Sequence, residues 1–168
     1  GYERGTSTAA LATLFDQLRP EIRSIAAAAV EKSNQQSITL PAGPYPVAAQ
    51  QKLNQQIADS IGFDFTAGRI DTTAHPFCTT LGPHDVRLTT RYDENDFTSS
   101  LFGVLHEAGH GLYEQGLPAD DFGLPSGAAV SLGIHESQSR LWENHVGRSR
   151  EFWQKWYPVA QEIFPQLN

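Results

Sequence analysis

The pentapeptide His106-Glu107-Ala108-Gly109-His110 constrains this sequence more than any other stretch, because it has the pattern His-Glu-x-x-His. In an α-helix, residues four apart lie one above the other, so both histidines can bind one ion. Glu107 is offset by about 100° around the helix, where its carboxylate can reach a water on the metal without becoming a ligand. In metallopeptidases the residue at this offset is the general base. The pattern therefore predicts a zinc site with His106 and His110 as ligands and Glu107 as the catalytic base.

The sequence around the pentapeptide predicts an amphipathic helix. Either Asp96 or Thr98 can cap its first turn, and Gly116 followed by Pro118 ends it. Its apolar residues recur every three or four positions, which is the spacing of one buried helix face. They are Phe97, Leu101, Val104, Leu105, Ala108 and Leu112. We therefore expect the two histidines on a helix that is held by a core.

A third protein ligand is expected, because catalytic zinc usually has three and keeps a fourth position open. A second helical pattern runs from about Ala129 to Val146, ends at Gly147 and carries His135 and Glu136. Its predicted inner side consists of Val130, Ile134, Leu141, Trp142 and His145. If this helix folds back against the first, either His135 or Glu136 could complete the site. Zinc accepts imidazole and carboxylate, and the helical phase does not choose between them.

Three more helices are predicted from apolar periodicity. The first follows a cap at Thr6 or Ser7, contains Pro20 and reads as packing scaffold. Its apolar residues are Leu11, Leu14, Phe15, Leu18, Ile22 and Ile25. After a loop over residues 33–46, a helix over 47–61 is closed by Gly62. The third follows Gly147, and its aromatic residues Phe152, Trp153, Trp156 and Tyr157 are expected in the core or an interface.

A small β-hairpin is predicted before the metal helix. Val86, Leu88 and Thr90 alternate with polar residues at the period of a strand, and the threonine-rich run 71–80 is the expected partner. Gly82-Pro83 supplies the turn. An exposed strand beside a metal could hold a peptide by backbone pairing. A purely structural hairpin fits the sequence equally well.

Composition narrows the class of protein. With 12 basic and 19 acidic side chains the net charge is −7, so the positive footprint of a nucleic-acid-binding protein is missing. No apolar run is long enough for a membrane span. The single cysteine, Cys78, cannot form an internal disulfide, which fits a cytoplasmic protein. The 168 residues are expected to form one domain, and because they contain no methionine we interpret residues 1–168 as a piece of a longer protein.

Four motifs, in this order and spacing, resemble those of the carboxypeptidase Taq family of zinc metallocarboxypeptidases. They are His75-Pro76-Phe77, Asp85-Val86-Arg87-Leu88-Thr89, His106-Glu107-Ala108-Gly109-His110 and His135-Glu136-Ser137-Gln138-Ser139-Arg140. The resemblance implies a mainly α-helical, zincin-like metallopeptidase core with a deep groove and a small β-hairpin or sheet beside the zinc helix. It implies Glu136, and not His135, as the third ligand. His75 and Arg87 are candidates for contacts with substrate.

The same resemblance implies an enzyme, a zinc metallocarboxypeptidase that removes single residues from the C-terminus of peptides. One zinc ion per chain is expected, with cobalt as the alternative, and a homodimer is the implied assembly. Family members are much longer, and the arginine that holds the substrate carboxylate and the donors for the oxyanion are expected outside this chain. An alternative is therefore a zinc-binding structural fragment without activity of its own. Endopeptidase or aminopeptidase activity is a third reading, which the zinc motif alone would permit.

Overall fold

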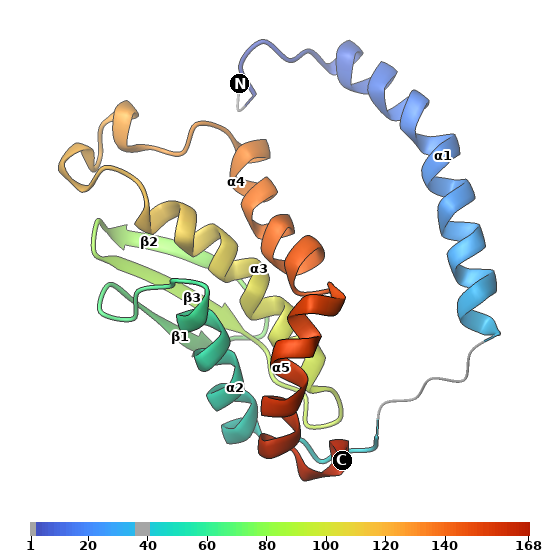
Figure 1. Ribbon diagram of the computed structural model, residues 1–168. Coiled ribbons are helices and arrows are strands. Elements are labelled where there is room, and N and C mark those ends of the chain that lie inside the picture. Colours follow the sequence, from blue (N-terminus) through green and yellow to red (C-terminus); the bar gives the residue numbers. More distant parts are fainter. Residues whose placement is uncertain (1–2, 36–40) are drawn as a thin grey trace. The chain divides into compact units, whose positions relative to one another are not determined.

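The computed structural model describes residues 3–35 and 41–168. The chain forms two compact units, Gly1–Pro41 and Ala42–Asn168 (Figure 1). The predicted arrangement of residues 1–168 as one domain stays a prediction. In the described ranges, no helix combines the length and the apolar composition that crossing a membrane requires.

In the described part of the first unit, the chain forms one long helix, α1 (Thr8–Asn34). The Ser7 hydroxyl accepts a hydrogen bond from the Ala10 amide, which is the predicted cap. Helix α1 contains Pro20, and it occupies the start of the predicted loop 33–46, of which residues 36–40 lie outside the described residues. None of its residues is buried, so its apolar residues are exposed here, whereas the sequence predicted packing.

The second unit holds the remaining elements. In chain order they are α2 (Val47–Ser60), β1 (Gly68–Thr72), β2 (Cys78–Gly82), β3 (Asp85–Thr90), α3 (Phe97–Gln115), two 3₁₀ turns (Ala119–Asp121 and Pro125–Gly127), α4 (Leu132–Arg140), the π-helical segment η3 (Leu141–Val146), α5 (Arg150–Ile163) and a final 3₁₀ turn (Pro165–Leu167). This mainly helical fold with a small sheet confirms the predicted fold class.

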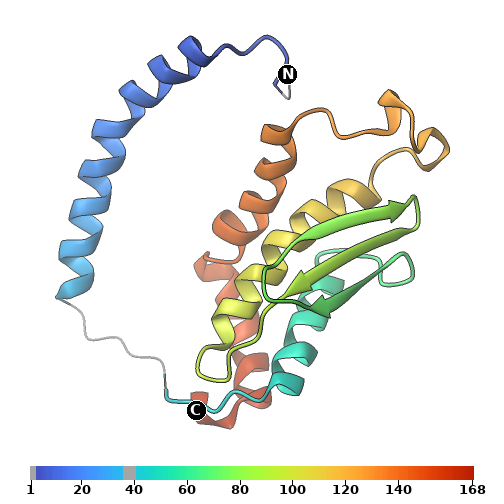
Figure 2. The same cartoon turned by 180° about the vertical axis from the view of Figure 1, so that it is seen from behind.

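The sheet has the order β1-β3-β2 (Figure 2). Strands β2 and β3 form the predicted antiparallel hairpin, with Thr79 opposite Arg87. Strand β1 pairs with β3 in parallel, placing Ile70 beside Leu88, and the sequence analysis did not predict this third strand. A parallel neighbour requires a crossover rather than a tight turn, and here the crossover includes β2 itself.

Helix α3 lies between two parts of the core. On one side it packs with α2 and α5 in a cluster centred on Tyr45, Leu101 and Phe164. On the other side Val104 and Ala108 contact Val86 and Leu88 of β3, together with Phe63 from the turn after α2. Nine of the 19 residues of α3 are buried. The helix that carries the pentapeptide is therefore fixed in position by packing on both sides.

The helix after the loop differs from its prediction. It begins at Leu132 rather than near Ala129, because Ser131 caps it by accepting a hydrogen bond from the Ile134 amide. The predicted inner side is wrong: Val130, Ile134 and Leu141 are 73%, 48% and 41% exposed. The segment instead turns a polar side toward α3. For the following helix α5 the expectation is confirmed for Phe152 and Trp156, which are buried, whereas Tyr157 is 42% exposed.

Candidate metal centre

The two histidines of α3 owe their position to local sequence. The Asp96 carboxylate accepts a hydrogen bond from the Thr98 amide and so starts the helix. From there Val104 and Ala108, both completely buried, fix the rotation of the helix against the sheet. His106 and His110 consequently lie one turn apart, with ring centroids separated by 5.0 Å.

Glycine at position 109 allows α4 to cross α3 at close range. A Cβ atom at Gly109 would lie 2.5 Å from the carbonyl oxygen of Gln138 and 2.6 Å from Cα of Ser139. Ser139 is the one buried residue of α4, at 0% exposure. Because backbone meets backbone here, Glu136, one turn before the crossing, reaches the two histidines.

His106, His110 and Glu136 converge on one point. Glu136 Oε2 lies 3.7 Å from His106 Nε2 and 3.2 Å from His110 Nε2, and the three ligand atoms lie within 4.8 Å of one another. Two atoms bound to a tetrahedral ion at about 2.0–2.1 Å are about 3.3–3.4 Å apart. The separations and the donor set of two imidazoles and one carboxylate therefore fit a divalent metal.

The ring of His106 is held by Glu143 from η3. His106 Nδ1 lies 2.9 Å from Glu143 Oε2, and since an ionised carboxylate only accepts, Nδ1 carries the proton. This leaves the lone pair on Nε2, the atom that faces Glu136. Burial acts to raise the pKa of Glu143, but hydrogen bonds from His106 and Arg148 outweigh it and the pKa is lowered. The carboxylate of Glu143 thus stays ionised as an acceptor.

Two arginines surround these carboxylates. Arg140 donates from Nε to Glu136 Oε1 at 2.8 Å, and its Nη1 lies 3.4 Å from Glu143 Oε2. Burial acts to raise the pKa of Glu136, while hydrogen bonds from Ser139 and Arg140 lower it, with a net decrease. Arg148 donates to Glu143 Oε1 at 3.0 Å and lies over the Phe102 ring.

His135, the alternative third ligand, is placed differently from Glu136. Its Nδ1 lies 2.5 Å from Nδ1 of His110, and its Nε2 lies 2.7 Å from Glu114 Oε1. Both nitrogens therefore face other side chains. The structure brings Glu136, and not His135, to the Nε2 atoms of both histidines, although the assignment of the ligands stays a prediction.

Glu107 has the surroundings of a proton acceptor. It is 7% exposed, and burial, followed by the negative charges of Glu136 and Glu143, raises its pKa against the opposing effect of His106. Within the described part of the chain no ion pair involves Glu107, in contrast to Glu136 and Glu143. Its carboxylate thus lies beside the candidate ligands, and no counter-ion binds it among the residues that the structure describes.

A groove of about 670 Å³ lies beside the candidate metal site, with His106 and Glu107 in its lining. The side of α3 between Asp96 and Glu107 contributes to its lining, and the other lining residues are His75, Pro76, Arg140, Glu143 and Arg148. His75, a predicted substrate residue, is therefore in the groove with Glu107. Other hollows lie elsewhere, including one of about 390 Å³ between α2 and α5 that contains no metal-ligating pair.

Arg87, the other predicted substrate residue, lies apart from this groove. Its guanidinium forms an ion pair with Asp85 on the same strand at 2.8 Å. Its neighbours Val86 and Leu88 point into the core beside α3, so strand alternation puts Arg87 on the other face of the sheet. A role for Arg87 in substrate binding stays a prediction.

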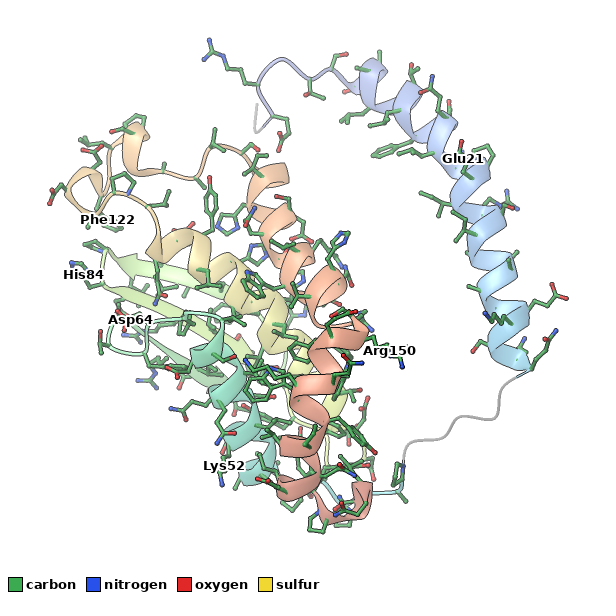
Figure 3. All side chains as sticks on the ribbon, viewed as in Figure 1. Glu21, Lys52, Asp64, His84, Phe122 and Arg150 are labelled. Atoms are coloured by element: carbon green, nitrogen blue, oxygen red, sulfur yellow. The ribbon has the colours of Figure 1, made fainter. Side chains whose placement is uncertain are left out.

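Sequence reasoning missed several residues of the site. Glu114 follows His110 by four residues, and Glu143 follows Glu136 by seven, so both could have been found from helical spacing. No spacing rule marks Gly109 as the crossing point, because that role depends on a helix that is distant in sequence. The loop between α3 and α4, which carries Phe122 in Figure 3, was also unassigned.

Residues 1–168 match the family described as Carboxypeptidase Taq (M32) metallopeptidase. Thermostable carboxypeptidase 1 of Thermus thermophilus is 47% identical over 168 residues, which is 100% of this chain and 33% of that protein. Carboxypeptidase 1 of Bacillus subtilis is 38% identical over 164 residues, covering 98% of this chain and 33% of that protein.

Solved structures agree with the sequence comparison. The M32 carboxypeptidase from Deinococcus radiodurans superposes with a TM-score of 0.88 at 40% identity, over 99% of this chain and 33% of that one. A structure described as the BsuCP crystal structure gives a TM-score of 0.91 at 38% identity, over 98% and 33% of the two chains. This chain thus spans about one third of the length of these relatives.

Proposed function

This chain belongs to the carboxypeptidase Taq (M32) metallopeptidase family, and on that premise we propose that it forms the catalytic core of a zinc metallocarboxypeptidase. The substrate is a peptide, and the reaction is hydrolysis of its C-terminal peptide bond. One observation carries the proposal: two imidazoles and a carboxylate converge next to a buried carboxylate that lines a groove and forms no ion pair with any described residue.

His106, His110 and Glu136 would hold one zinc ion, with cobalt as the alternative metal. A bound zinc ion supplies a Lewis acid that polarises a carbonyl and lowers the pKa of a water toward about 7. Hydrogen bonds to the candidate ligands support their role in metal binding. Glu143 orients His106, and Arg140 neutralises part of the charge of Glu136. Hydrogen bonds to the far side of metal ligands are the usual means of orienting them.

Glu107 would move the proton. Its carboxylate takes a proton from the attacking water, whose oxygen forms the new bond to the carbonyl carbon. Glu107 then gives this proton to the nitrogen of the departing amino acid as the C–N bond breaks, so that one water is consumed for each peptide bond. The raised pKa of Glu107 suits both steps, because a proton is more easily held by this carboxylate than by an exposed one.

The peptide would lie in the groove that His75 and Glu107 line. Strand β2 is an edge of the sheet, and its Thr80 contacts Glu114 near the end of α3. An extended peptide can pair with such an edge through its backbone, which gives affinity with little dependence on side chains. Backbone pairing of this kind would hold a peptide without a deep specificity pocket.

A second candidate is a zinc-binding module without turnover, and one observation favours it. A carboxypeptidase has to bind the free carboxylate of its substrate, and both arginines that line the groove already have partners. Arg140 is bonded to Glu136, and Arg148 to Glu143. The cation for the substrate would then come from the part of the longer relatives that this chain does not cover.

Hydrolysis of a blocked dipeptide separates the two candidates. With zinc present, the enzyme core should release the C-terminal residue from the free acid but not from the amidated form, and Glu107→Gln should abolish release while retaining zinc. Stoichiometric zinc with no release would support the module. Cleavage of the amidated dipeptide would instead indicate a different peptidase, and absence of zinc from the wild type would refute both candidates. The homodimer, the cytoplasmic location and the lack of nucleic-acid and membrane partners stay predictions.

A further inference from the structure

Behind His110, on the side away from Glu136, lies a row of polar side chains that the proposed mechanism does not use. His110 Nδ1 lies 2.5 Å from His135 Nδ1, and His135 Nε2 lies 2.7 Å from Glu114 Oε1. The other oxygen of Glu114 accepts a hydrogen bond from the Thr80 hydroxyl at 2.8 Å. We call these four residues the His110 relay, and it joins the metal site to strand β2.

Each proton in the relay can be assigned from the acceptor at its end. An ionised carboxylate has no proton to donate, so Nε2 of His135 carries the proton toward Glu114. A neutral imidazole has one proton, which leaves the lone pair of His135 on Nδ1. That lone pair faces His110 Nδ1, and a hydrogen bond between them requires the proton on His110. The lone pair of His110 is then on Nε2, the atom beside Glu136.

Burial keeps this arrangement away from competing water. The side chains of His110, His135 and Glu114 are 16%, 20% and 18% exposed. Tyr113 packs against the ring of His135, with centroids 5.1 Å apart, and limits its rotation. Exposed histidines exchange tautomers freely, whereas a ring with both nitrogens bonded in a half-buried site is restricted to one.

We propose that His135, Glu114 and Thr80 are positioning residues that fix the tautomer and the orientation of His110 for metal binding. The inference rests on the proposed function, because it needs a metal at Nε2 of His110. The same segment would then serve the site twice, with Glu136 as a ligand and His135 as the support of another ligand. A carboxylate supports His106 directly, but for His110 an imidazole stands between the ligand and the carboxylate.

The test measures zinc affinity by competition with a chromogenic chelator. His135→Phe keeps a ring against Tyr113 but offers no acceptor, so affinity should fall by about 10- to 100-fold. His135→Gln offers a side-chain oxygen and should recover part of the loss. Glu114→Gln should have a smaller effect than His135→Phe, and Thr80→Val the smallest. His145→Ala, an exposed histidine beyond the relay, is the matched control and should leave affinity unchanged.

A second measurement does not depend on the variants folding. Nitrogen-15 spectra of the imidazoles in the zinc-loaded wild type should show the proton of His110 on Nδ1 and that of His135 on Nε2. The opposite tautomers, or equal zinc affinity in His135→Phe and the wild type, would overturn the inference while leaving the proposed function intact. If the wild type does not bind zinc, the proposed function is refuted. The inference then falls with it, because His110 has no metal for the relay to support.

Discussion

Helices α3 and α4 carry the side chains of the same candidate metal site but are held in different ways. Nine of the 19 residues of α3 are buried, between the sheet on one side and α2 and α5 on the other. In α4 only Ser139 is buried, and Ile134 is half exposed. His106 and His110 are thus positioned by packing, whereas Glu136 depends on one tight crossing and on polar contacts. The difference shows that the side chains of one candidate metal site can be held by two means. Some are positioned by a helix packed in the core, and others by polar contacts around the site.

The largest effect should come from a matched pair of truncations. Leu101→Ala removes a side chain of α3 that is completely buried, and should lower the free energy of unfolding by about 2–5 kcal/mol. Ile134→Ala on α4 truncates a side chain that is 48% exposed, and should cost less than about 0.5 kcal/mol. Urea unfolding measures both. Similar losses would show that α4 is packed as firmly as α3.

The crossing itself is tested by Gly109→Ala. The new methyl group would meet the backbone of Gln138 and Ser139, which cannot rotate away, so stability should fall by about 1–3 kcal/mol. Zinc affinity should also fall, because α4 has to move outward and take Glu136 with it. Gly103→Ala is the control in the same helix, since its methyl group would meet only the Thr90 hydroxyl, at 3.0 Å. Equal behaviour of the two variants would contradict the role of Gly109.

Metal removal should separate the two helices in an exchange experiment. We expect amide hydrogen exchange in α4 and η3 to accelerate about tenfold on chelation, equivalent to about 1.4 kcal/mol, with little change in α3. Loss of the ion removes the bond that ties Glu136 to α3, while the core around α3 remains. In Glu136→Ala the response of α4 to zinc should disappear. A uniform response of both helices would mean that they open together.

A smaller effect is expected from Ser139→Ala. The Ser139 hydroxyl lies 3.1 Å from Glu136 Oε2 and 2.7 Å from the Glu136 carbonyl oxygen, and the side chain is buried. Loss of this contact should weaken zinc binding by about 1 kcal/mol, or roughly fivefold. Ser137→Ala provides the comparison, because its hydroxyl donates to the Ile134 carbonyl and does not contact Glu136. Equal zinc affinities for the two variants would remove Ser139 from the set of positioning contacts.

The smallest effect is expected from the pH dependence of the Cys78 thiol, on the packed side of α3. Burial, and then the charges of Glu107 and Glu114, raises the pKa of the Cys78 thiol from 9.0 to about 12. The unfolded chain releases this proton first, so the contribution to stability is complete below pH 9 and is lost as the pH rises toward 12. Between pH 9 and 10 the loss should be at most about 1 kcal/mol. Cys78→Ala should lack this part of the pH dependence, and a parallel decline in both proteins would contradict the assignment.

How far the sequence predicted the structure also differs between the two helices. The start, end and buried face of α3 follow from local spacing, because its neighbours in sequence decide its cap and its apolar stripe. For α4 the same apolar pattern gave the wrong inner side, since the helix is placed by its contact with Gly109 and not by burial of Ile134 or Leu141. The parallel strand β1 was missed for a related reason, as its partner lies across a crossover.

The candidate site shows the same division. Spacing alone predicted that His106 and His110 share a face, but it could not choose between Glu136 and His135, which are neighbours in sequence. The choice depends on what lies opposite each side chain, and Glu114 opposite His135 became visible only once the two helices were placed together. For α1 the sequence correctly predicted a helix capped by Ser7, but none of the residues of this helix is buried, so its predicted packing is not seen.

The two variable positions of the pentapeptide are as restricted as its named ones. Ala108 is enclosed by the core under α3, and Gly109 is where α4 touches α3. Grafting His-Glu-x-x-His onto a host scaffold with arbitrary residues at these positions would therefore give two ligands and no third. A designer would have to transfer the small fourth residue together with a partner helix. The smallest segment that can be grafted is therefore a pair of helices and not the pentapeptide alone.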